Sequence, residues 1–178
     1  MSEWRGAFRV AVVSDTHGCL DSRVIDVVSE CAAAIHAGDI GGAAILDSLQ
    51  PERGSVFAVA GNNDARHTWN ESEWNALESL PEIHHIVFRC GVISVEHGHR
   101  VRDTRRYHEE LRQRHADSAL VVYGHTHVRV IDRSQSPWVI NPGASGKERT
   151  KGGPSCLTVE INEREIEVFE HRFKPRTV

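Results

Sequence analysis

Short apolar runs alternate with polar segments rich in turn residues along the chain. These runs are rich in Val, Ile and Ala, which is the pattern of buried β-strands. Six of them span Phe8–Ser14, Ala32–Ala37, Ser55–Ala60, Ile83–Phe88, Val92–Val95 and Ala119–Tyr123. Four later runs, which are typical of a β-meander, span Val128–Asp132, Trp138–Ile140, Cys156–Ile161 and Ile166–Phe169.

Helical periodicity separates the first three runs. Ser22–Cys31 repeats its apolar residues on one helix face, and Ala43–Leu49 follows the second run. Further helices are predicted over Glu71–Ser79 and Thr104–His115. Strand–helix–strand units followed by hairpins predict an α/β fold with mixed sheets and helices outside. No linker or low-complexity tract divides the 178 residues, so we expect one domain over residues 1–178.

Composition excludes several classes of protein. A hydrophobic content of 39% is enough for a globular core, and the net charge of −4 argues against coating nucleic acid or an anionic membrane. No apolar run reaches the roughly 20 residues of a membrane helix. Because the N-terminus also lacks an apolar signal region, we expect a cytoplasmic protein.

The cysteines form no recognisable site. Cys19, Cys31, Cys90 and Cys156 are scattered, and none belongs to a Cys-x-x-Cys pair. This spacing indicates neither a zinc ribbon nor a thioredoxin-type centre. We therefore expect unreactive thiols in a reducing compartment.

Metal-binding residue types follow five of the predicted strands. The segments are Asp15-Thr16-His17, Gly38-Asp39, Gly61-Asn62-Asn63-Asp64, His97-Gly98-His99 and Gly124-His125-Thr126-His127. Asp15, Asp39 and Asn62 are 24 and 23 residues apart, which suits one strand–helix–strand crossover each. Since parallel strands bring their carboxyl ends to one edge of a sheet, we expect these residues to converge there.

The donor types indicate what this edge binds. Each segment alone is an ordinary turn or helix cap, but five in succession after strands indicate a metal site. Oxygen and imidazole donors without thiolate favour Mn, Fe, Zn, Ni or Co over a structural zinc. His36 is expected to be a core histidine beside this site. The remaining histidines are expected at the surface: His67, His84, His85, His108, His115 and His171.

These segments resemble the motifs of the calcineurin-like metallophosphoesterases. That family's pattern is Asp-x-His, Gly-Asp, Gly-Asn-x-Asp or Glu, a His-Gly segment and Gly-His-x-His, and it extends here over residues 15–127. Asn141-Pro142-Gly143 is also similar to a turn of the small prokaryotic phosphodiesterase branch. The resemblance implies an α/β fold of two mixed β-sheets packed as a sandwich and flanked by helices.

The resemblance also implies two divalent transition-metal ions. Asp15, His17 and His127 would hold one ion and Asn62, His97 and His125 the other, with Asp39 bridging the two. Mn is the expected metal, with Ni, Fe, Co and Zn as alternatives. In such a site a hydroxide that bridges the ions attacks phosphorus in line and expels an alcohol.

One departure from the family narrows the substrate to a phosphodiester. The family's monoesterases usually carry His at the third position of Gly-Asn-x-Asp, whereas this chain has Asn63, which cannot act as a general acid. We therefore expect a phosphodiesterase acting on small-molecule or nucleotide diesters. His99 is a substitute proton donor or a structural residue, and Asp64 is expected to orient a ligand or the backbone. Gly38-Asp39-Ile40-Gly41-Gly42 lacks the phosphate-clamping Arg of the protein Ser/Thr phosphatases.

Two other functions remain alternatives. The same fold serves as a non-catalytic retromer subunit with a degenerate metal site, whereas every ligand position is filled here, His17 included. A nucleotide-specific phosphohydrolase is the other alternative. It could stack a base on Trp69 or Trp74, for which packing in the core is the competing interpretation.

Partners follow from the remaining segments. Gly143–Pro154, with Lys147, Glu148, Arg149 and Lys151, is predicted to be an exposed, solvated loop, and contact with an anionic substrate or a partner is the alternative. The hairpin strands could pair across an interface, which favours a homo-oligomer. Neither stable nucleic-acid binding nor a membrane partner is expected.

Overall fold

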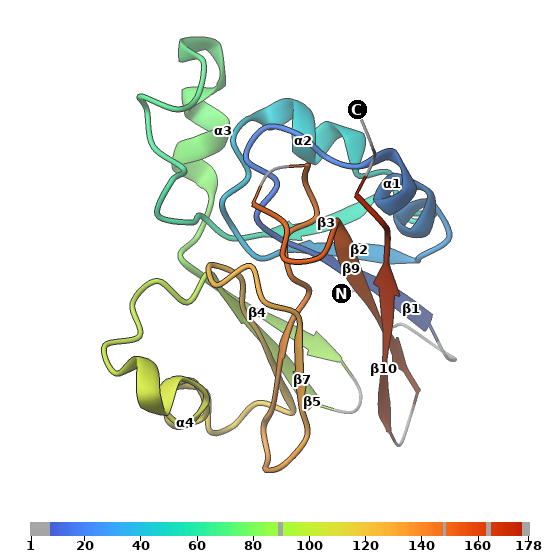
Figure 1. The fold of residues 1–178 in the computed structure, drawn as a ribbon, viewed down its shortest axis with the longest axis vertical. Helices are drawn as coiled ribbons and strands as arrows, with labels where there is room; N and C mark the ends of the chain where they lie inside the picture. Colours follow the sequence, from blue (N-terminus) through green and yellow to red (C-terminus); the bar gives the residue numbers. More distant parts are fainter. Residues whose placement is uncertain (1–7, 89–90, 148, 163–164, 176–178) are drawn as a thin grey trace.

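The computed structural model describes residues 8–88, 91–147, 149–162 and 165–175. Two mixed five-stranded sheets face one another (Figure 1), which confirms the predicted fold class. The first sheet has the order β10-β9-β1-β2-β3, and the second has the order β4-β5-β6-β8-β7. The strands of the first are β1 (Phe8–Val13), β2 (Ala33–His36), β3 (Ser55–Ala58), β9 (Ser155–Ile161) and β10 (Ile166–Arg172). Those of the second are β4 (Ile83–Phe88), β5 (Gly91–Glu96), β6 (Leu120–Val122), β7 (Val130–Asp132) and β8 (Trp138–Asn141).

Helices cover the outer faces of the sheets. They are α1 (Ser22–Ser29), α2 (Ala43–Ser48), α3 (Trp74–Ser79) and α4 (Tyr107–Arg114), with 3₁₀ turns at Glu71–Glu73 and Thr104–Arg106. Asp21 caps α1, because its side chain accepts a hydrogen bond from the backbone N–H of Arg23 at 3.0 Å. α1 packs on the first sheet, and Leu111 of α4 packs against Val121 and Val139 of the second.

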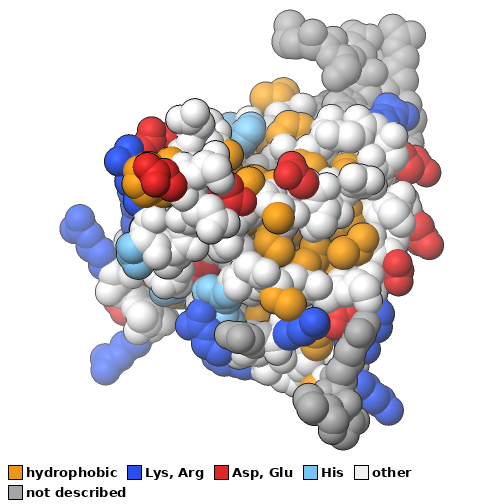
Figure 2. Space-filling view, turned by 90° about the horizontal axis from the view of Figure 1, so that it is seen from above, with side chains coloured by type: hydrophobic (Ala, Val, Ile, Leu, Met, Phe, Trp, Pro, Cys, Tyr) orange, Lys and Arg blue, Asp and Glu red, His pale blue; other side chains and the backbone are white. Residues whose placement is uncertain are grey.

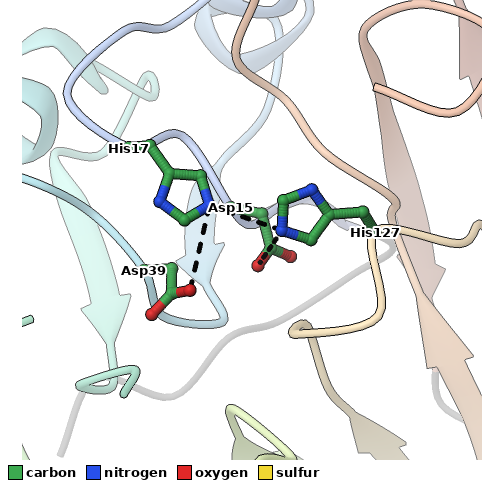
Figure 3. A group of neighbouring side chains, drawn as sticks. All are labelled: Asp15, His17, Asp39 and His127. Carbon is green, nitrogen blue, oxygen red and sulfur yellow. Dashed lines mark hydrogen bonds and ion pairs between the residues drawn. The ribbon is translucent and has the colours of Figure 1, made fainter. Parts of the chain in front are cut away.

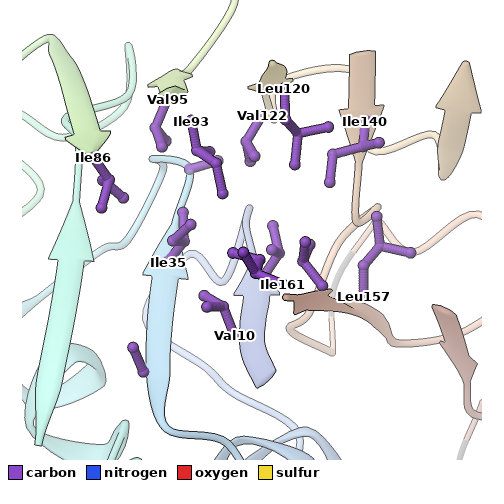
Figure 4. Close-up of a cluster of buried hydrophobic side chains, with 14 of the residues drawn as sticks. Val10, Ile35, Ile86, Ile93, Val95, Leu120, Val122, Ile140, Leu157 and Ile161 are labelled. Carbon is purple, nitrogen blue, oxygen red and sulfur yellow. The ribbon is translucent and has the colours of Figure 1, made fainter. Parts of the chain in front are cut away.

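The main core lies between the sheets (Figure 4). Along β1, Val10 and Val12 point into this core, whereas Ala11 and Val13 point to the opposite face, where α1 packs. This alternation is the period of two that a strand imposes on its side chains. Because both faces are covered there, β1 reads in sequence as an apolar run over Val10–Val13.

The parallel strands decide where the loops meet. β1 pairs in parallel with β2, and β2 with β3, so their carboxyl ends lie at one edge. In the second sheet β5, β6 and β8 are parallel in the same way. The backbone N–H of Gly124 donates to the carbonyl of His97, and His97 contacts Ala37 from the first sheet. The loops of both sheets therefore meet at the same end of the molecule.

All predicted strands and helices are present, with ends displaced by a few residues. The prediction of a surface position was wrong for His115, which is buried with its Nε2 2.8 Å from Glu96 Oε2. It was right for His67 and His85, whereas His84, His108 and His171 are half-buried.

The prediction that the whole segment 143–154 is an exposed loop was wrong. Residues 143–146 and 153–154 are buried, whereas 147, 149, 151 and 152 are exposed. The cause is a set of hydrogen bonds to distant segments: the Ser145 N–H donates to the Ser14 carbonyl at 2.9 Å, and Asp21 N–H donates to the Ser145 carbonyl at 3.1 Å.

The buried thiols agree with the expectation of unreactive cysteines. Burial raises the pKa of Cys31 to about 11 and that of Cys156 to about 12, so both stay protonated at neutral pH. Cys19 is free and half-buried, and Cys90 lies outside the described residues. No helix in the described part of the chain has the length and apolar character needed to cross a membrane.

Candidate metal centre

Four predicted ligands converge where the loops after β1, β2 and β6 meet (Figure 3). Asp15, His17, Asp39 and His127 each offer one donor atom, and these atoms all lie within 4.8 Å of one another. His127 Nε2 is 3.2 Å from Asp15 Oδ1, and His17 Nε2 is 3.8 Å from Asp39 Oδ2. Asp15 and Asp39 are 0% and 2% exposed. Two buried carboxylates facing two imidazoles make a donor set suited to a divalent cation.

Asp39 also faces a second group of histidines. Its Oδ1 lies 3.3 Å from His97 Nε2, while its Oδ2 is the atom that faces His17. The ring of His125 lies beside that of His97, with 5.2 Å between the ring centroids. Asn62 is exposed, and among the described residues no hydrogen bond joins its side chain to the other candidates. Asp39 therefore stands between two sets of imidazoles.

Backbone carbonyls orient two of these imidazoles. His97 Nδ1–H donates to the carbonyl of Ala37 at 2.8 Å, which leaves Nε2 as the lone-pair nitrogen beside Asp39. His127 Nδ1–H donates to the carbonyl of Arg149 at 3.2 Å, which directs its Nε2 to Asp15. Hydrogen bonds of this kind fix the tautomer of a metal-binding histidine.

Two buried polar atoms of this cluster have no hydrogen-bond partner among the described residues. They are Asp15 Oδ2 and His97 Nε2. Leaving a polar group buried and unpaired costs about 1–3 kcal/mol. Because both atoms are metal-ligand types and lie at the convergence point, a bound cation would satisfy them. The residues present thus fit the metal site that the motifs predict.

The backbone is strained at five of the seven predicted ligands. Asp15, His17, Asp39, His125 and His127 have φ values of 54°, 46°, 55°, 64° and 55°. Among the described non-glycine residues, the only other positive φ belongs to Arg149, which contacts two of them. Each such residue costs about 1–3 kcal/mol, and strain of this kind concentrates at functional sites.

Close packing around Asp39 leaves no room for a side chain at Gly61. A Cβ there would lie 2.2 Å from Asp39 Oδ1. Asn63 fixes the same carboxylate, because its backbone N–H donates to Oδ1 at 2.8 Å and its Nδ2 donates to Oδ2 at 2.6 Å. Asn63 is therefore a positioning residue for Asp39.

Asp64 ties together the loops after β2 and β3. Its carboxylate accepts hydrogen bonds from the backbone N–H groups of Ile40, Gly41 and Gly61 and from the indole N–H of Trp69, at 2.8–3.1 Å. This arrangement agrees with the expectation that Asp64 orients the backbone. Trp69 is 5% exposed, and its indole N–H is hydrogen-bonded to Asp64. The prediction that Trp69 could stack on a base is therefore wrong. Trp74 packs instead against the Arg66 guanidinium, 4.6 Å from its ring centroid.

With this geometry established, the chain was compared with known proteins. Residues 8–164 match the model of the calcineurin-like phosphoesterase superfamily domain. The chain belongs to this family.

Relatives and solved structures agree with the assignment. The chain is 28% identical to a phosphodiesterase of Methanocaldococcus jannaschii over an alignment of 151 positions, and the alignment covers 76% of this chain and 82% of that protein. It is 27% identical to a probable metallophosphoesterase of Mycoplasma genitalium over 167 residues, 89% of this chain and 90% of that one. In fold it is similar to Entamoeba histolytica Vps29 complexed with Zn²⁺, with a TM-score of 0.69, 20% identity and coverage of 94% and 99%.

The electrostatics of this phosphoesterase site keep its donors in the state that binds metal. Burial alone would raise the pKa of Asp39, but the facing His97 imidazole and the hydrogen bonds from Asn63 hold it well below its usual range. Burial lowers the pKa of His17 and of His125, and neighbouring Arg149 and His97 lower them further. Asp39 is therefore ionised and these two imidazoles are neutral at neutral pH.

His97 titrates in the opposite direction. Burial lowers its pKa, but the facing Asp39 carboxylate outweighs burial and raises it above the ordinary value. A proton taken up at Nε2 would compete with a cation for this nitrogen, so metal binding there is favoured as pH rises.

Two residues beside the cluster complete the site. His99 is half-buried, with ring centroids 5.6 Å from His97 and 6.3 Å from His125, and burial followed by the charge of His97 lowers its pKa. Arg149 lies in the loop for which the sequence favoured solvation and left contact with an anionic substrate as the alternative. Its Nη2 lies 2.8 Å from His17 Nε2. The contact with His17 in particular was not predicted, because the charged run between positions 147 and 151 was its only signal in the sequence.

Proposed function

We propose that this phosphoesterase is a phosphodiesterase that uses two divalent cations. Asp15, His17 and His127 would hold one cation, and Asn62, His97 and His125 would hold the other. Asp39 is shared, because its two carboxylate oxygens face the two sets of imidazoles. This placement of Asp39 is the observation that carries the proposal.

The chemistry at such a pair of ions is well understood. Two bound cations lower the pKa of water between them and offset the charge of the phosphate oxygens. Residues of this chain hold the donor groups in position. Asn63 fixes the Asp39 carboxylate, and Asp64 joins the two loops that carry Asp39 and Asn62. Backbone carbonyls orient the rings of His97 and His127. Oxygen and imidazole donors suit Mn²⁺, with Ni, Fe, Co and Zn as the alternatives.

The preference for diesters rests on Asn63. Its amide already donates to Asp39 and carries no acidic proton, so it cannot protonate a poor leaving group. A diester whose alcohol leaves without strong protonation suits this site better. His99 lies beside His97 and His125 and is the side chain placed to serve a leaving oxygen. The relationship to the phosphodiesterase of Methanocaldococcus jannaschii supports the same choice.

A non-catalytic scaffold is the second candidate, because several similar structures are Vps29. The discriminating experiment supplies metal-stripped protein with Mn²⁺, Ni²⁺, Co²⁺ or Zn²⁺ and compares bis-p-nitrophenyl phosphate with p-nitrophenyl phosphate. Metal-dependent turnover that favours the diester is the expected result. Absence of turnover with every metal would contradict the proposal and favour the scaffold.

A further inference from the structure

Arg149 lies at the candidate metal centre on a loop that hydrogen bonds hold to neighbouring strand ends. The loop joins β8 to β9, and Ser145 within it donates its N–H to the carbonyl of Ser14, directly before Asp15. The side chain of Asn141 donates to the carbonyl of Gly124 at 2.7 Å and accepts from the N–H of Gly143 at 2.8 Å. The position of Arg149 therefore depends on the same strand ends that carry the predicted ligands.

Both the backbone and the side chain of Arg149 contact predicted ligands. Its carbonyl accepts from His127 Nδ1–H at 3.2 Å, and its Nη2 lies 2.8 Å from Nε2 and 3.1 Å from Nδ1 of His17. Its φ is 52°, a conformation that arginine rarely adopts without compensation. The side chain is exposed, so a ligand can reach it from solvent. Figure 2 shows lysine and arginine side chains beside histidines on this face.

The guanidinium has no carboxylate partner among the described residues within ion-pair distance. Instead it contacts His17 Nε2, the atom that also faces Asp39 and His127. A cation at His17 Nε2 would take this lone pair and repel the guanidinium. Arg149 then needs an anion at the edge of the cluster, where the phosphate of a substrate would lie. A guanidinium presents a planar fork of N–H donors that matches two phosphate oxygens.

We propose, building on the phosphodiesterase function above, that Arg149 binds the non-bridging oxygens of the substrate's phosphate group. Negative charge on these oxygens increases as phosphorus is attacked, so the contact strengthens in the transition state. Removal of one such donor commonly costs about 10²–10³ in kcat. Arg149 would thus supply, from a loop late in the chain, a cation that the segment after Asp39 lacks.

The test measures binding of orthophosphate to Mn²⁺-loaded protein by calorimetry, which requires no turnover. Arg149→Ala removes the guanidinium, and Arg149→Lys keeps the positive charge without the paired N–H donors. Lys147→Ala, which removes an exposed charge from the same loop, is the matched control. We expect at least tenfold weaker phosphate binding for Arg149→Ala, an intermediate loss for Arg149→Lys and no change for Lys147→Ala. Mn²⁺ affinity should be equal or higher in Arg149→Ala, since the guanidinium no longer competes for His17.

Four results would overturn the role of Arg149. The first three are no phosphate binding by the wild type, phosphate affinity of Arg149→Ala within threefold of wild type, and an equal loss in Lys147→Ala. The fourth is a parallel loss of Mn²⁺ affinity in Arg149→Ala, because the residue would then serve to build the metal site. Failure of the proposed function is distinguishable, since it appears as absent diester turnover by wild-type protein that binds both Mn²⁺ and phosphate.

Discussion

Acid should destabilise this protein through His36, a fully buried histidine at the end of β2. Its Nδ1 accepts the N–H of Gly38 at 3.2 Å, so its Nε2–H donates to Thr16 Oγ1 at 2.9 Å. Thr16 in turn donates to the carbonyl of Ile40 at 2.9 Å. A second proton on the ring would break the bond to Gly38, next to Asp39. Burial, the largest cause, lowers the pKa of His36 to about 4.

The sign and size of the effect follow from linkage. Between the folded pKa of about 4 and the ordinary value of 6.5, the unfolded chain carries a proton at this site that the folded chain lacks. The stability due to neutral His36 is therefore fully present above pH 6.5 and is lost as pH falls toward 4. At about 1.4 kcal/mol per pKa unit, the loss between pH 7.5 and 4.5 is about 2.5 kcal/mol.

The assay is urea denaturation of metal-free protein at several pH values between 7.5 and 4.5, for the wild type and for His36→Gln. Glutamine can still donate to Thr16 but does not titrate. The wild type should lose about 2.5 kcal/mol more than the variant over this range, while all other histidines contribute to both proteins. Equal losses in the two proteins would refute the reasoning, because His36 would then not be held neutral by the fold.

Three further substitutions test the site. Asp39→Asn should abolish Mn²⁺ binding in calorimetry together with diester turnover, since in the proposed site this one carboxylate would serve both cations; retention of one tightly bound ion would contradict this. Asn63→His should raise the ratio of p-nitrophenyl phosphate to bis-p-nitrophenyl phosphate turnover, while total activity falls because Asp39 loses its amide partner. An unchanged ratio would contradict the general-acid argument. Gly124→Ala would place a Cβ 2.0 Å from Ser14 Oγ, so it should cost about 1–3 kcal/mol in urea unfolding, and a wild-type midpoint would be inconsistent with this packing.

The fold could be predicted because local and long-range signals agree. The apolar run Val10–Val13 of β1 indicates a strand covered on both faces, and the polar residues that follow it are at the end that parallel pairing brings together. The positions of Asp15, Asp39 and His127 follow from that topology. Their pairing with particular metals came from the family resemblance and stays a prediction, as does the role of Asn62.

The rest depended on contacts between segments far apart in the sequence. His115 is buried because Glu96 and Arg114 form a charged group around it, which a polar helical sequence does not indicate. Arg149 reaches His17 because hydrogen bonds hold Ser145, in the same loop, to Ser14, which is 131 residues away in the chain. A basic loop looks the same in sequence whether it is solvated or placed over a site.

Anomalous diffraction from a Mn²⁺-soaked crystal would show whether the Asp39 carboxylate serves two cations. We expect two peaks about 3.5–4 Å apart. One should be bound by Asp15, His17, Asp39 and His127, and the other by Asp39, Asn62, His97 and His125. A single peak, or a second peak away from Asn62 and His97, would contradict this expectation.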